Sequence, residues 1–154
     1  MSSAVLPAPL ANRPAWVAQT RAIADRVRRR VLGLTIDRNG CYLSQTLSSA
    51  DLLATLYSHT MKLGPSEGAQ IPPPFGGVPG RDGATFGEGA AYNGPQGAGF
   101  DRLLVSPAHY AVAIYATLVE TGRMAAQGLD QFNVDGSTVE MIGAEHSRPC
   151  CRRR

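Results

Sequence analysis

Apolar residues recur at helical spacing in the first 63 residues. Between Pro14 and about Leu34 they follow at steps of three, four or seven, which predicts an amphipathic helix whose arginines lie largely off the apolar stripe. A second helix is predicted to begin at Ser48 to Asp51, a start that resembles a capping box. His59 lies off the stripe of this helix, so we expect it at the surface. The expected stripe is Leu52, Leu53, Leu56, Tyr57 and Leu63.

Residues 102–122 predict a strand followed by a helix. The apolar run 102–105 indicates a short buried strand, Ser106 and Pro107 suit the start of a helix, and Thr121 with Gly122 suits its end. A strand, a tight turn and a helix form one unit of an open sheet, so the predicted fold class is α/β, with helices packed on a parallel sheet. The helix would present free N–H groups to an anion. His109 in its first turn is therefore a candidate anion ligand, or else a partner of a nearby carbonyl.

Residues 64–99 differ sharply from both neighbours. They hold 11 of the 17 glycines and 6 of the 11 prolines, which excludes a regular element. Four aromatic residues occur within or directly after this stretch, which favours a lid-like or interface loop, with a flexible linker as the alternative. We place an N-terminal arm at 1–12, one domain at 13–147, and a tail at 148–154.

Charge and cysteine content exclude several classes of protein. The formal net charge is +3, but four arginines lie in residues 148–154, so residues 1–147 hold 11 basic and 12 acidic groups. Nucleic-acid binding is not expected, and the arginines of residues 21–30 are better explained as a solvated helix face than as a phosphate site. No apolar run is long enough for a membrane helix, and no basic secretory leader begins the chain. Three cysteines make no disulfide framework and no zinc motif, so we expect a reduced, cytoplasmic protein.

Three segments resemble the N-terminal, pyrophosphate-binding part of transketolases, especially those made of two separate subunits. Residues 40–57 (GCYLSQTLSSADLLATLY) resemble the family's glycine-rich turn and helix. Residues 100–110 (FDRLLVSPAHY) resemble its aspartate–arginine strand leading to a serine and a histidine. Residues 135–137 (DGS) with 143–146 (GAEH) resemble the stretch before its cofactor-gripping loop.

The resemblance implies an incomplete thiamine-diphosphate-binding fold and a transferase that moves a two-carbon ketol unit between sugar phosphates. It implies thiamine diphosphate and Mg²⁺ as cofactors, held between subunits, and a C-terminal transketolase subunit as partner in a homo- or hetero-oligomer. His109 matches the histidine that contacts the diphosphate. His146 is the nearest match to a later substrate-contacting histidine. Tyr42 or Cys41 stands where the family has an early substrate-contacting histidine, so an altered donor sugar is expected.

The metal-binding Gly-Asp-Gly motif of the family is absent from the sequence, so no metal ligand is predicted here. The Arg- and Cys-rich residues 148–154 differ from the family's usual sequence, and we interpret them as the product of a frameshift just after His146. This chain alone is then expected to be inactive. The alternative is a non-catalytic paralogue that binds and regulates a transketolase-like partner.

Overall fold

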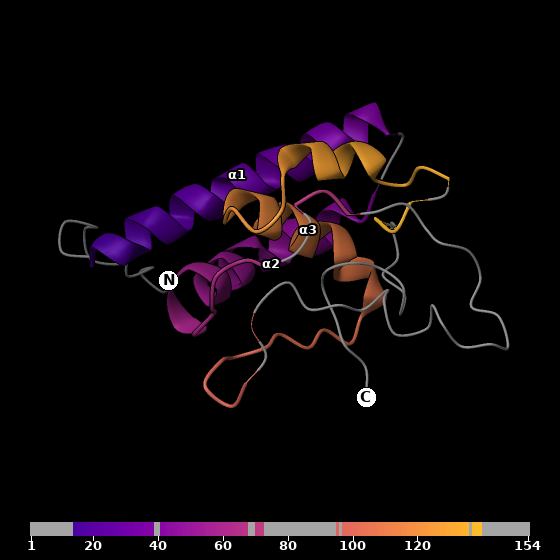
Figure 1. Cartoon of the computed structure of the whole chain (residues 1–154). Helices are drawn as coiled ribbons and strands as arrows, with labels where there is room; N and C mark the ends of the chain where they lie inside the picture. Colours follow the sequence, from indigo (N-terminus) through magenta and orange to yellow (C-terminus); the bar gives the residue numbers. More distant parts are fainter. Residues whose placement is uncertain are drawn as a thin grey trace, which may run out of the picture.

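The computed structural model describes residues 14–38, 41–67, 70–72, 95, 97–135 and 137–139. Three α-helices dominate this part of the chain: α1 (Ala15–Asp37), α2 (Leu43–Thr55) and α3 (Ala111–Glu120). A π-helical turn, Leu56–Thr60, continues α2, and 3-10 turns occupy Ala108–Tyr110 and Ala126–Gln131. Figure 1 shows the long α1 along one side, with α2 and α3 packed beside it.

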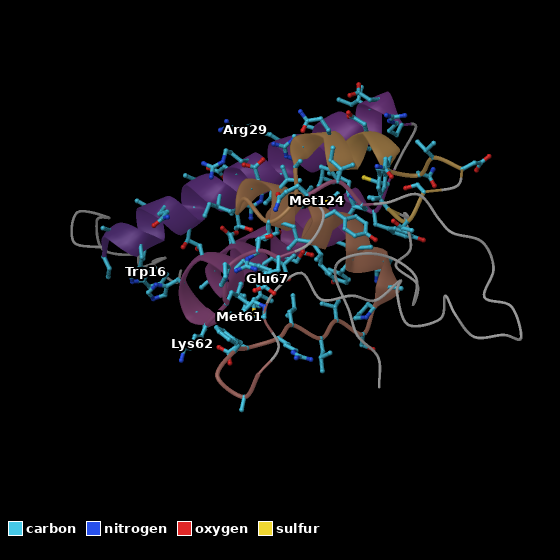
Figure 2. All side chains as sticks on the ribbon, viewed as in Figure 1. Trp16, Arg29, Met61, Lys62, Glu67 and Met124 are labelled. Atoms are coloured by element: carbon cyan, nitrogen blue, oxygen red, sulfur yellow. The ribbon has the colours of Figure 1, made fainter. Side chains whose placement is uncertain are left out.

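Helix α1 confirms the first predicted helix and extends it by three residues. The buried face holds Ile23, Val27 and Val31, together with Thr20 and Ala24. The Thr20 hydroxyl lies 3.2 Å from that of Ser58, which links α1 to the π-helical turn. At the start of the helix the Trp16 ring stacks on His59, with ring centroids 4.1 Å apart (Figure 2). His59 is exposed, as the sequence predicted.

The predicted start of the second helix was wrong, because α2 begins at Leu43 rather than near Ser48. The two serines that resembled a cap lie inside the helix, and their hydroxyls donate hydrogen bonds to a carbonyl one turn earlier. The Ser48 and Ser49 hydroxyls lie 3.0 and 2.7 Å from the carbonyl oxygen of Gln45. The predicted stripe was also partly wrong, since Leu53 is buried but Leu52 is 61% exposed.

Helix α3 lies at the centre of the core. Residues 111–118 are all buried, as expected for a helix that is apolar nearly all round. The predicted end is confirmed: Gly122 has a φ of +72°, and the N–H groups of Gly122 and Arg123 donate to the carbonyls of Val119 and Leu118. These two hydrogen bonds form a Schellman motif. Glycine suits it because it adopts the left-handed backbone conformation without strain.

The prediction of an α/β fold with a partial parallel sheet was wrong. Among the described residues there is no strand, and the architecture is helical. Residues 102–105 are extended, but no hydrogen bond joins the backbone of Leu103, Leu104 or Val105 to another described residue. An extended apolar run becomes a strand only when a neighbour completes the ladder, and here α2 and α3 lie beside it instead. Ser106 likewise caps no helix, because a 3-10 turn precedes α3.

None of the helices in the described ranges is long and apolar enough to cross a membrane. Of the predicted loop 64–99, the described residues form neither helix nor strand, and the rest of it lies outside the described residues. The N-terminal arm and the tail 148–154 lie outside them as well.

Candidate functional site

Tyr42 lies directly before α2, at the centre of a tight turn. Its φ of −75° and ψ of 68° are those of an inverse γ-turn. The Leu43 N–H closes this turn by donating to the Cys41 carbonyl at 2.8 Å. The Tyr42 side chain is half-buried.

His109 lies in the 3-10 turn before α3, and its ring faces that of Tyr42. The two ring centroids are 5.5 Å apart and the planes are inclined by 48°. On the other side the Tyr110 ring centroid is 5.2 Å from that of His109. The structure thus brings together two of the three predicted site residues, which are 67 positions apart in the sequence. His146, the third, lies outside the described residues.

Cys41 lies on the opposite side of the same turn. Its sulfur is 2.8 Å from the Thr35 hydroxyl of α1, and its side chain packs against the core. Of the two residues that the sequence left open for this position, Tyr42 is therefore the one whose ring contacts His109.

The helix starts beside this pair lack side-chain caps. Neither α2, α3 nor the turn before α3 has a capping hydrogen bond or an acidic residue in its first turn. Among the described residues, the N–H groups of Ser44 and Gln45 at the start of α2 have no acceptor in the backbone. Uncapped N–H groups and the positive helix pole favour an anion, and a His109 ring N–H adds a further donor.

An apolar groove continues from Tyr110 between α2 and the extended residues 103–107. Its volume is about 540 Å³. Leu52, Leu53 and Leu56 line one wall, and Leu103 with Val105 lines the other. The groove accepts apolar groups next to the ring cluster.

The arginines of α1 do not contribute to this site. Arg26 and Arg30 both contact the Glu120 carboxylate, at 2.6 and 2.5 Å, and Arg28 contacts Asp51. The hydrogen bond to Asp51 raises the pKa of Arg28 above its already high usual value. Arg29 is exposed and projects from the outer side of α1 (Figure 2). The prediction of a solvated face therefore holds for Arg29, whereas three other arginines pair with acids of α2 and α3.

No group of three or more His, Cys, Asp or Glu residues that could hold a metal ion occurs among the described residues. The site residues thus fit an anionic diphosphate, but they supply no ligand set for magnesium. Sequence reasoning missed Thr35, which belongs to no motif, and it gave no role to Tyr110, which ends the segment 100–110; both are identified by their neighbours in space.

Comparison with known proteins gives one distant relationship. The chain is 28% identical over 120 residues to an uncharacterized transketolase family protein of Sinorhizobium fredii, and the two are distantly homologous. The match covers 78% of this chain and 33% of the relative, so the chain spans about a third of that protein's length. No protein-family model matches the chain, and no solved structure matches it significantly.

Proposed function

We propose that this chain is the diphosphate-binding part of a thiamine-diphosphate-dependent transferase of the transketolase type. The observation that carries the proposal is the pairing of Tyr42 with His109 beside the uncapped start of α2. Distant homology to a transketolase family protein supports it. The reaction would move a two-carbon ketol unit between sugar phosphates.

Each site residue has a distinct part in this proposal. A ring N–H of His109 donates to the diphosphate, and the N–H groups at the start of α2 add positive potential. The hydroxyl of Tyr42, whose ring contacts that of His109, hydrogen-bonds a hydroxyl of the sugar. His146 is a second substrate contact. Thiamine diphosphate, if bound here, would supply the nucleophilic carbon and the electron sink that ketol transfer needs.

We propose that a C-terminal transketolase subunit, in a homo- or hetero-oligomer, supplies the remaining ligands of the cofactor. In this proposal the chain alone is inactive. A second candidate is a non-catalytic paralogue that binds and regulates a transketolase-like partner.

Ligand titration of the full chain, followed by NMR of its histidine rings, tests the proposal. Pyrophosphate and thiamine diphosphate are expected to shift the His109 signals, whereas thiamine without phosphate is not. His109→Ala should abolish the response, and His59→Ala is the matched control because His59 stacks on Trp16 away from the site. A His109 ring that does not respond to pyrophosphate would favour the paralogue. Micromolar, magnesium-dependent binding by the chain alone would contradict the need for a second polypeptide.

A further inference from the structure

We infer that Cys41 is a positioning residue, whose thiol holds Tyr42 against His109 by anchoring the turn before α2 to α1. The inference rests on the proposed function, in which Tyr42 contacts the sugar. The geometry that supports it comes from contacts between described residues.

The anchor is a short chain of hydrogen bonds onto the backbone of α1. The Thr35 hydroxyl donates to the Val31 carbonyl at 2.7 Å, so its proton is engaged. Its oxygen is then the acceptor for the Cys41 thiol, 2.8 Å away. Val31 is fully buried, which makes this attachment point one of the most rigid on the helix.

The turn connects the hydrogen-bonded Cys41 directly to Tyr42. Cys41 and Leu43 close the inverse γ-turn that has Tyr42 at its centre, so the side chains of Cys41 and Tyr42 leave the backbone in fixed, different directions. The Tyr42 carbonyl accepts from the Thr46 N–H at 3.4 Å, which ties the same residue to α2.

His109 is positioned by other elements. Its 3-10 turn leads into α3, whose buried residues pack between α1 and α2. The separation of the Tyr42 and His109 rings therefore depends on where the turn 41–43 lies relative to α1. The thiol makes the side-chain hydrogen bond between that turn and α1, and Leu43 of the same turn packs against the core.

The His109 ring protons report on this geometry without any ligand, because a nearby aromatic ring shifts their NMR signals. Tyr42→Leu removes the Tyr42 ring, so the change it causes in the His109 signals is the largest change expected from loss of this ring contact. Cys41→Ala and Thr35→Val are expected to shift the His109 signals in the same direction by a substantial fraction of that amount. Cys41→Ser keeps a donor and should restore the wild-type signals. Thr55→Val is the matched control, because Thr55 makes the same kind of 2.7 Å bond to a helical carbonyl away from the site.

The inference is overturned if Cys41→Ala and Thr35→Val lower the melting temperature but leave the His109 signals unchanged. If Thr35→Val does not fold, the comparison of Cys41→Ala with Cys41→Ser decides alone. These spectra are recorded without ligand, so they are independent of the proposed function. Pyrophosphate added afterwards to the wild-type sample tests that function separately.

Discussion

The pair of arginines on Glu120 provides the sharpest test of how this fold is held together. Arg26 of α1 contacts one carboxylate oxygen of Glu120, and Arg30 contacts the other through two nitrogen atoms. The Glu120 side chain is only 7% exposed, whereas those of Arg26 and Arg30 are 47% and 31% exposed. Removal of the carboxylate therefore removes both ion pairs between the last turn of α3 and the middle of α1.

The expected cost follows from this partial burial. A hydrogen bond to a charged group is worth about 1.5–3 kcal/mol, and an exposed ion pair is worth about 0.2–1 kcal/mol. Both arginines regain some hydration when the carboxylate is lost, so Glu120→Ala should lower the free energy of unfolding by about 2–3 kcal/mol. Glu120→Gln keeps the shape and one acceptor, and it should cost about 1–2 kcal/mol.

Asp51→Asn supplies the matched comparison. Asp51 pairs with Arg28, but its side chain is 63% exposed, so the loss should stay below about 1 kcal/mol. Urea denaturation followed by far-UV circular dichroism, with linear extrapolation to water, measures all three variants. Equal losses for Glu120→Gln and Asp51→Asn would refute the reasoning, because burial of the carboxylate would then make no difference.

Four further predictions concern the core, a helix end and the site. Phe132→Ala, at a fully buried ring, should lower the free energy of unfolding by about 3–5 kcal/mol in the same urea assay. Gly122→Ala should cost about 1 kcal/mol, entirely from the φ of +72°, since a methyl group there meets no atom within 4 Å. His109→Ala, in the complex with a partner subunit, should weaken cofactor binding by about 1.5–3 kcal/mol in calorimetry while the fold survives. Tyr42→Phe in that complex should lower turnover by leaving a sugar hydroxyl unpaired, and an unchanged profile over a panel of ketose donors would contradict this role.

Residue order alone predicts the helices that bury an apolar stripe. The stripe of α1 and the apolar run of α3 predicted both helices, because periodic burial leaves a direct trace in residue order. Gly122 predicted the end of α3 for a similarly local reason, since only the backbone at that residue is involved. The sequence also singled out His109, through its place at the start of a predicted helix and through the resemblance, and Tyr42, through the resemblance alone.

Features that depend on partners distant in the chain follow from the packing of the helices. Residues 102–105 have the composition of a strand, but a strand exists only with a neighbour, and α2 and α3 lie there instead. Ser48 and Ser49 suited a cap as well as a helix interior, and the packing of α2 from Leu43 selected the interior.

The site itself shows the same division. Residue order left Cys41 and Tyr42 equivalent, because a gap of one residue exchanges them. The structure separates them, since the Cys41 thiol meets Thr35 on α1 while the Tyr42 ring meets His109 before α3. That choice depends on contacts between three elements, and the order of residues along one of them does not contain it.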